Sequence, residues 1–297
     1  MPLPADRIAP AATGMRLRSL LFVPGDRPER FAKAAASGAD ALILDLEDSV
    51  AAAAKGAARD AVAVYLRAPH GEAAVMVRVN PLGGDLIAAD LAALAGLSAA
   101  AVVLPKAEGA ASVRDLAARL AAAGIAAPIL PIATETPAAI FRLGSYAEAG
   151  VPLAGLTWGA EDLPAAIGAT TAREADGRYT APYQLVRSLA LFGAHAAGVP
   201  AIETVYPAFR DIAGLDMYAR TAARDGFTGM MAIHPAQVAT INAAFSPDET
   251  QLAAARAIVA AFAAAPDAGT LQVDGRMVDA PHLKQARHLL ERAGERP

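Results

Sequence analysis

Short apolar runs alternate with longer stretches of helical periodicity from residue 18 onward. This alternation is typical of parallel βα units. Most of the runs are apolar at both alternating sets of positions, as expected of strands covered by helices on one side and by barrel neighbours on the other. We therefore predict a closed (β/α)8 barrel of the TIM type, with strands at residues 19–23, 41–46, 74–80, 101–105, 128–133, 153–158, 201–205 and 229–233.

The chain continues well beyond the eighth predicted strand. Two helical stretches, 251–264 and 281–293, flank the segment LQVDGRMV, in which Asp-Gly between two short alternating runs predicts a β-hairpin. This extension either caps its own barrel or reaches a neighbouring subunit. The expected organisation is a flexible arm at residues 1–15, a catalytic barrel at 16–246 and a C-terminal helical and hairpin extension at 247–297.

Composition and charge exclude several classes of function. The 297 residues include no cysteine, which rules out disulfides, iron–sulfur clusters and thiol catalysis. A net charge of -4 gives no reason to expect nucleic acid or a membrane surface as a partner. No apolar run approaches the ~20 residues of a membrane span, and residues 1–14 lack the apolar core of a signal peptide. We expect a cytoplasmic protein.

Two acids follow neighbouring predicted strands. Glu135 comes after the fifth strand and Asp162 after the sixth, so their carboxylates could share one cation at the barrel mouth. Two carboxylates completed by water and substrate oxygens are how Mg²⁺ is usually held. The alternative is that both acids are helix N-terminal carboxylates, which the helix dipole and unpaired N–H groups favour. Spacing alone does not decide between them.

Three further charged residues mark the ends of strands two and three. Asp45 and Glu47 share one side of their strand and could hydrogen-bond metal-bound water. Alternatively, Asp48 and Ser49 cap the next helix while Asp45 pairs with an arginine of a neighbouring strand. Arg78 interrupts an apolar strand, and a buried guanidinium needs an acidic partner. That partner is either a substrate carboxylate, which we favour, or one of the two acids.

Lys106 ends the fourth strand, and His234 follows the eighth. A lysine at this place could form a Schiff base with a 2-oxo acid, but we favour a lysine that is solvated or paired with acids at the edge of the metal site. His234 precedes Pro235, which favours a helix-start role over catalysis. The polar segment 168–180 is long for a simple connection, and it is a candidate lid or partner-binding loop.

Several sequence blocks together resemble the citrate lyase beta-subunit family of the HpcH/HpaI aldolase group, which includes malyl-, citramalyl- and citryl-CoA lyases. They run in family order over residues 18–286, and that succession is highly specific. The matching blocks are RSLLFVPGDRPERFAKAAASGADALILDLEDSV, VRVN, LPKAE, ET after the fifth strand, LTWGAEDL, GFTGMMAIHPAQV and MVDAPHLKQA.

The resemblance implies a trimer, or a dimer of trimers, whose barrels cleave or form a C–C bond in a β-hydroxyacyl-CoA thioester. It implies that Glu135 and Asp162 hold Mg²⁺ and that Arg78 binds the substrate carboxylate. Asp279 matches the acid that enters the active site from a neighbouring subunit in the CoA lyases. The alternative for Asp279 is a helix cap before Pro281.

The implied chemistry begins when a base takes the β-hydroxyl proton. The C–C bond then breaks to give a 2-oxo acid and an acyl-CoA enolate, which Asp279 protonates. We expect apolar neighbours such as Met277 and Val278 to raise the pKa of Asp279. The backbone N–H groups expected to help hold the substrate carboxylate are those of Gly159, Ala160 and Glu161.

The chain departs from the family pattern at two positions. Glu203 stands where an aspartate is common, and Met230 stands where a lysine is common. Without that lysine, the acyl carrier could be coenzyme A or a carrier protein, and the intact Asp279 block favours coenzyme A. Two alternative functions remain, namely a pyruvate-type aldolase and a citryl-carrier-protein lyase subunit of a larger complex.

Overall fold

The computed structural model describes residues 15–68 and 70–295. The expected N-terminal arm at residues 1–15 therefore lies outside the described residues, except for Met15. The chain divides into two compact units, Met1–Asn242 and Ala243–Pro297.

All eight predicted strands form in the first unit, and they are parallel. Their order is β5-β4-β3-β2-β1-β8-β7-β6, and the bridges Ile129↔Leu153 and Ile132↔Thr157 join the two ends. The sheet is thus a nearly closed barrel, and the predicted fold is confirmed. The strands are β1 (Ser19–Pro24), β2 (Ala41–Asp45), β3 (Ala74–Arg78), β4 (Ala101–Leu104), β5 (Ile129–Pro131), β6 (Leu156–Thr157), β7 (Ala201–Glu203) and β8 (Gly229–Ala232).

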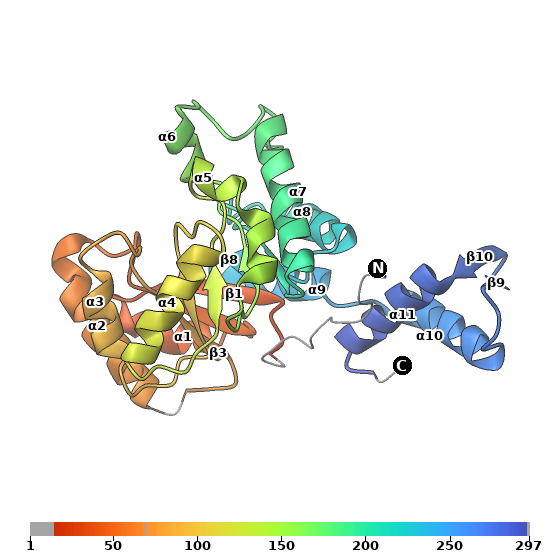
Figure 1. The fold of residues 1–297 in the computed structure, drawn as a ribbon, viewed down its shortest axis with the longest axis horizontal. Coiled ribbons are helices and arrows are strands. Elements are labelled where there is room, and N and C mark those ends of the chain that lie inside the picture. The colour runs from red at the N-terminus through yellow and green to blue at the C-terminus, as the bar shows by residue number, and fades with distance from the viewer. Residues whose placement is uncertain (1–14, 69, 296–297) are drawn as a thin grey trace. The chain divides into compact units, whose positions relative to one another are not determined.

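Helices connect the strands around the barrel (Figure 1). The longer helices bury an apolar stripe, such as Ala58, Val62 and Leu66 of α2 at a spacing of four residues. The α-helices are α1 (Phe31–Ala35), α2 (Lys55–Arg67), α3 (Ile87–Leu94), α4 (Ala110–Ala122), α5 (Pro137–Ile140), α6 (Leu163–Ile167), α7 (Ala181–Ala196), α8 (Ile212–Asp225) and α9 (Val238–Ala244). The 3-10 helices are η1 (Pro28–Arg30), η2 (Ala52–Ala54), η3 (Leu143–Glu148) and η4 (Pro235–Gln237).

The barrel interior is filled by alternate residues of its strands. Leu20, Ile43, Met76 and Leu130 belong to one buried cluster at the centre. The intervening residues of the same strands, such as Leu42, are equally buried because they face the surrounding helices. Each such side chain contributes about 1.5–3 kcal/mol through burial. This packing fixes the strand ends from which the polar residues project.

His234 has the helix-start role predicted for it. It occupies the N-cap position of η4, one residue before the first helical position, and its Nδ1 accepts a hydrogen bond from the Ala236 amide at 3.1 Å. The Gln237 side chain accepts hydrogen bonds from the amides of Ile233 and His234, at 2.9 and 3.1 Å. Together these bonds satisfy the first turn of η4.

The second unit is a pair of helices with a hairpin between them. The helices α10 (Glu249–Ala264) and α11 (Ala280–Arg292) lie side by side (Figure 1), and Leu252 and Leu290 belong to their shared core. The strands β9 (Thr270–Val273) and β10 (Arg276–Asp279) pair antiparallel. Asp274 and Gly275 both have positive φ, as a two-residue hairpin turn requires, so the predicted hairpin is confirmed.

Within residues 15–68 and 70–295, no helix combines the length and the apolar character needed to cross a bilayer.

Candidate active site

Asp45 and Arg78 are cross-strand partners at the ends of β2 and β3. Arg78 donates from Nε to Oδ1 and from Nη2 to Oδ2 of Asp45, both at 2.6 Å, which is a bidentate ion pair. Burial raises the pKa of Asp45, but the hydrogen bonds and charge of Arg78 hold it below its ordinary value. The alternative in which Asp45 pairs with a neighbouring arginine is therefore correct.

The helix-capping part of that alternative is wrong. The carboxylate of Asp45, rather than that of Asp48, accepts hydrogen bonds from the turn, from the Glu47 amide at 2.9 Å and the Ser49 amide at 3.1 Å. The following 3-10 helix begins after Ala51, which makes no side-chain cap. Asp45 thus fixes both Arg78 and the turn that carries Glu47.

Glu47 lies between two cations. Its Oε2 is 2.9 Å from Nη1 of Arg78, and its Oε1 accepts a hydrogen bond from Nζ of Lys106 at 2.6 Å. The residue is only 2% exposed. Burial raises the pKa of Glu47 above its ordinary value even though both cations oppose the shift. Glu47 therefore links the third strand end to the fourth.

Arg78 keeps donors for a further partner. Its hydrogen bonds to Asp45 use one N–H each on Nε and Nη2, and Nη1 meets Glu47 as an ion pair. A guanidinium has five N–H groups. The Phe22 ring lies 4.8 Å from the Arg78 Cζ and covers one face. The remaining N–H groups on Nη1 and Nη2 could take a substrate carboxylate while the acids hold the side chain in place.

Lys106 connects the acids that follow three strands, namely β2, β5 and β6. Its backbone has a φ of 51°, and its N–H donates to Oε2 of Glu135 at 2.5 Å. Its Nζ also lies 3.8 Å from Oδ1 of Asp162. Burial lowers the pKa of Lys106, but Glu47, Glu135 and Asp162 together raise it well above the ordinary value. Because a Schiff base forms from the neutral amine, this pairing disfavours the Schiff-base role.

Glu135 and Asp162 do not act as helix caps here. Helix α5 is capped by Thr136, whose side chain accepts from the Ala139 amide. Asp162 occupies the N-cap position of α6, but its side chain makes no capping hydrogen bond. Glu135 is 4% exposed, and burial, with Glu47 and Asp162 adding to the effect, raises its pKa to about 8. The geometry thus favours the cation-binding alternative over the capping one.

Gly159 brings the end of β6 against Glu135. A Cβ at this glycine would lie 3.0 Å from Cγ of Glu135, so no larger residue fits without a shift. The Thr134 hydroxyl donates to the Gly159 carbonyl at 2.8 Å and accepts from its amide at 3.0 Å. The Gly159 N–H is therefore engaged, and Ala160 and Glu161 carry the amides from this turn that could face a substrate.

Glu203 anchors the same strand end from the other side. It is fully buried and accepts hydrogen bonds from the Trp158 indole at 2.5 Å, Thr204 N at 2.9 Å and Arg187 Nε at 2.7 Å. The sequence marked Glu203 only as a departure from the family pattern. The one sequence signal of this anchoring role was Trp158, which directly precedes the turn with Glu161 and Asp162 and donates to Glu203. Met230 is fully buried in β8.

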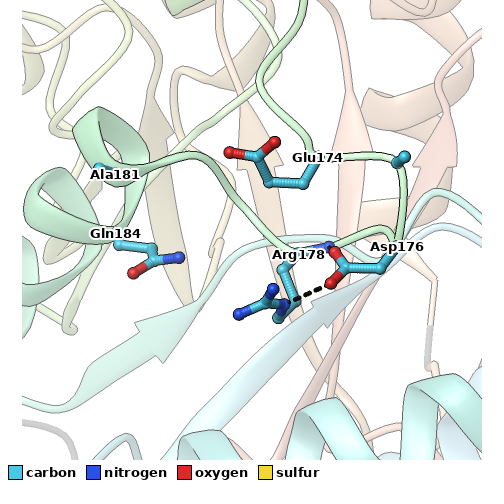
Figure 2. Close-up of a pocket in the computed structure, with 6 residues that line it drawn as sticks. Glu174, Asp176, Arg178, Ala181 and Gln184 are labelled. Carbon is cyan, nitrogen blue, oxygen red and sulfur yellow. Dashed lines mark hydrogen bonds and ion pairs between the residues drawn. The ribbon is translucent and has the colours of Figure 1, made fainter.

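The 168–180 segment folds as a hairpin rather than an irregular loop. The backbones of Arg173 and Tyr179 form an antiparallel bridge, and the Arg173 Cζ lies 4.0 Å from the centroid of the Tyr179 ring. The ring centroids of Tyr179 and Trp158 are 5.2 Å apart. Figure 2 shows Glu174 and Gln184 pointing into a cavity of about 430 Å³ beside this hairpin. None of the acids described above lines that cavity, and the lid role stays a prediction.

Asp279 lies in the second unit, at the start of α11. The Nδ1 of His282 is 2.5 Å from Oδ1 of Asp279, whose side chain is 37% exposed, and this contact lowers the pKa of Asp279. The expected raised pKa is wrong for the single chain, because His282 contacts the carboxylate and Met277, at 70% exposed, does not bury it. The position at a helix start agrees with the capping alternative.

Within residues 15–68 and 70–295, the side chains do not form a complete cage for a metal ion. In the described part of the chain, no three His, Cys, Asp or Glu side chains converge on one point. A cation between Glu135 and Asp162 would take its other ligands from water and substrate, as Mg²⁺ commonly does.

Comparison with known proteins decides the family. The sequence model for HpcH/HpaI aldolase/citrate lyase matches residues 18–235. The chain belongs to the HpcH/HpaI aldolase/citrate lyase family. The resemblance stated from the sequence blocks is thereby confirmed.

Relatives within this family extend over nearly the whole chain. A citrate lyase subunit beta-like protein of Mycobacterium tuberculosis is 42% identical over 275 residues, covering 93% of this chain and 95% of the relative. A (3S)-malyl-CoA thioesterase of Cereibacter sphaeroides is 34% identical, with 93% and 94% covered. The crystal structure of CitE from Mycobacterium tuberculosis with magnesium, acetoacetate and coenzyme A matches at 41% identity and a TM-score of 0.80, covering 96% and 100%.

Proposed function

We propose that this protein is a Mg²⁺-dependent lyase that cleaves or forms the C–C bond of a β-hydroxyacyl-CoA thioester, such as malyl-, citramalyl- or citryl-CoA. The observation that carries the proposal is the meeting of Glu135 and Asp162 with Lys106 at the mouth of the family's barrel. The proposal is further supported by the related CitE structure, which holds magnesium, acetoacetate and coenzyme A.

The residues present fit a magnesium ion. Glu135 and Asp162 offer hard carboxylate oxygens, the ligands that Mg²⁺ prefers. The buried carboxyl of Glu135 has a pKa raised to about 8, which a nearby divalent cation would lower. When bound, the ion supplies electrostatic stabilisation of the charge that develops on the substrate's hydroxyl, later oxo, oxygen. Asp45, Glu47 and Lys106 would orient the surroundings through their hydrogen bonds.

Arg78 is the proposed carboxylate-binding and catalytic residue. Its guanidinium is fixed by Asp45 and Glu47, so a substrate carboxylate meets a side chain that is already held in place. The amides of Ala160 and Glu161 in the adjacent turn would add donors to the same group, together with the close backbone approach that Gly159 permits. These groups orient the C–C bond that breaks.

Asp279 is proposed as the acid that protonates the acyl-CoA enolate in the cleavage direction. In the reverse direction it would deprotonate the acyl-CoA methyl group. We propose that it acts in the barrel of a neighbouring subunit of a homotrimer or dimer of trimers, consistent with its exposed side chain. Desolvation in that second barrel would raise its pKa from the low value of the single chain. The enzyme would work in the cytoplasm.

Thioester hydrolysis is a second candidate reaction, because the Cereibacter sphaeroides relative is named a (3S)-malyl-CoA thioesterase. A thioesterase breaks the C–S bond and releases free coenzyme A and a hydroxy acid. A lyase instead gives an acyl-CoA and a 2-oxo acid. A carrier-protein lyase subunit would leave coenzyme A thioesters untouched, and a plain aldolase would cleave the corresponding free acids.

Product identity separates these reactions. The purified chain is incubated with Mg²⁺ and each of malyl-CoA, citramalyl-CoA and citryl-CoA, and the products are resolved by chromatography with mass detection. The proposal predicts equal amounts of a 2-oxo acid and an acyl-CoA from at least one thioester. Release of free coenzyme A without a 2-oxo acid would assign the thioesterase reaction instead, and unchanged thioesters would contradict the proposal.

A further inference from the structure

A buried lysine lies directly behind Glu47. Lys55 opens α2, is 8% exposed, and donates from Nζ to the carbonyl oxygens of Leu46 and Glu47, at 2.6 and 2.7 Å, and to Oδ1 of Asn80 at 3.0 Å. An ammonium group has three protons, and these three acceptors account for all of them. All three are neutral oxygens, so no ion pair explains why a charge is buried here.

Asn80 extends the contact to a second buried charge. Its backbone amide and its side-chain Nδ2 both donate to Oδ2 of Asp90 at 2.7 Å. Asp90 is fully buried, and its Oδ1 accepts from Nε of Arg59 at 2.7 Å. The result is a chain of polar side chains from α3 to the ends of β3 and β2. Each member is held by the next, as a buried polar network requires.

The turn that carries Glu47 is held from two sides. On one side, Asp45 accepts the amides of Glu47 and Ser49. On the other side, Lys55 donates to the carbonyls of Leu46 and Glu47. Asp45, which accepts the two amides, also holds Arg78. The carbonyls that Lys55 binds contact no group that could meet a substrate. The contacts of Lys55 therefore serve the backbone of the turn.

We propose that Lys55 is a positioning residue that fixes the Leu46–Glu47 backbone, so that the Glu47 carboxylate reaches Arg78 and Lys106 together. The catalytic consequence rests on the proposed function, because Arg78 and Lys106 border the proposed substrate and metal positions. Without the ammonium group, the turn gains freedom and Glu47 no longer holds both cations in one arrangement. The effect of Lys55 on the reaction is transmitted through Glu47.

The substitution Lys55→Met tests this without removing the fold. The Leu46 carbonyl keeps a hydrogen bond from Asn80 Nδ2 at 3.0 Å, and the Glu47 carbonyl keeps one from Val50 at 3.0 Å. A methionine also fills most of the lysine's volume. The matched control is Arg67→Met, which removes an exposed cation from the same helix. The variant Lys55→Arg keeps the charge but not the compact three-way geometry.

The first readout does not depend on activity. Hydrogen exchange measured by mass spectrometry should show faster exchange of the 45–50 segment in Lys55→Met, with unchanged exchange in the other barrel strands. Arg67→Met should match the wild type throughout. Equal protection of the 45–50 segment in Lys55→Met and wild type would overturn the proposal. If Lys55→Met fails to fold, Asp90→Asn, which weakens the network one step away, provides the same comparison.

The second readout is a double-mutant cycle with Glu47→Gln. The variant Lys55→Met should lower kcat about 10–100-fold, the range for residues that orient a metal site's surroundings, and Lys55→Arg should restore only part of that loss. In the Glu47→Gln background the further loss should be small, because both substitutions act through one side chain. A full, additive loss would overturn the proposal. A wild type without lyase activity would remove the proposed function, and hydrogen exchange would still decide the role of Lys55.

Discussion

The backbone N–H of Lys106 lies 2.5 Å from Oε2 of Glu135, and Lys106 adopts a left-handed backbone conformation with φ of 51° to reach it. An unbranched residue other than glycine costs roughly 1 kcal/mol in this conformation. The same turn sends the ammonium group towards Glu47 and Asp162. One strained residue thus sets both the hydrogen bond to the buried acid and the charge beside it.

This conformation predicts an inverted preference between glycine and alanine. Both Lys106→Gly and Lys106→Ala lose the ammonium group, but only glycine adopts a φ of 51° without strain. Lys106→Gly should therefore be more stable than Lys106→Ala by about 1 kcal/mol in urea unfolding. At Lys284, which is exposed within helix α11, the order should be reversed by a similar amount. Greater stability of the alanine variant at position 106 would contradict the assigned conformation.

The raised pKa of Glu135 predicts that the metal-free protein loses stability as pH rises. The ordinary pKa is 4.5 and the folded value is about 8. Between these values the unfolded chain releases the proton while the folded chain retains it, so stability falls by at most about 1.4 kcal/mol per pH unit. Urea unfolding in EDTA between pH 5 and 8 measures this slope.

Two comparisons show whether Glu135 causes the pH dependence of stability. Glu135→Gln carries no ionisable group, so its slope between pH 5 and 8 should be smaller than that of the wild type. Because Mg²⁺ binds the ionised carboxylate, its affinity for the wild type should also increase as pH rises towards 8. Equal slopes for wild type and Glu135→Gln would mean that another group governs the pH dependence.

Gly159→Ala should disturb the proposed metal site more than the fold. The added Cβ would lie 3.0 Å from Cγ of Glu135 and 3.3 Å from Cγ2 of Ile132, so the Glu135 side chain must shift. We expect about 10–100-fold weaker Mg²⁺ binding by calorimetry, with a smaller change in the urea midpoint. Gly144→Ala is the control, because a Cβ there meets no atom within 4 Å. Unchanged Mg²⁺ affinity in Gly159→Ala would place the metal elsewhere.

Subunit mixing tests whether Asp279 acts in a neighbouring barrel. Asp279→Asn should bind Mg²⁺ but lose turnover, and Glu135→Gln should lose metal. If the two residues come from different chains, trimers reassembled from equal amounts of both inactive variants contain some complete sites. Random assembly would give about one quarter of wild-type activity. Absence of any recovery, despite verified mixed trimers, would show that Asp279 does not act in trans with Glu135.

The barrel was predictable because its strands are buried on both faces. Residues 41–46, for example, are all apolar except Asp45, and the eight runs give β1 to β8 with differences confined mainly to the ends. The hairpin of the extension was equally clear, since Asp274 and Gly275 supply the two positive φ angles that its turn needs. Local chemistry determined these elements.

The contacts within the site were harder to predict because they depend on register and backbone detail. The cross-strand partnership of Asp45 with Arg78 follows from one register of β2 and β3, which the sequence left as one of two alternatives. The Lys106 turn and the burial of Lys55 gave no sequence signal, since a lysine is usually exposed. The raised pKa expected for Asp279 failed because His282, three residues on, contacts it within the single chain.

The most direct test of the central claim is the initial rate of 2-oxo acid formation from the thioester substrate as a function of free Mg²⁺. The wild type should show a saturable increase from a negligible rate in EDTA, and Glu135→Gln and Asp162→Asn should stay near that baseline at Mg²⁺ concentrations that saturate the wild type. A rate that persists in EDTA, or wild-type Mg²⁺ dependence in both variants, would contradict the proposal that these two carboxylates hold the catalytic ion.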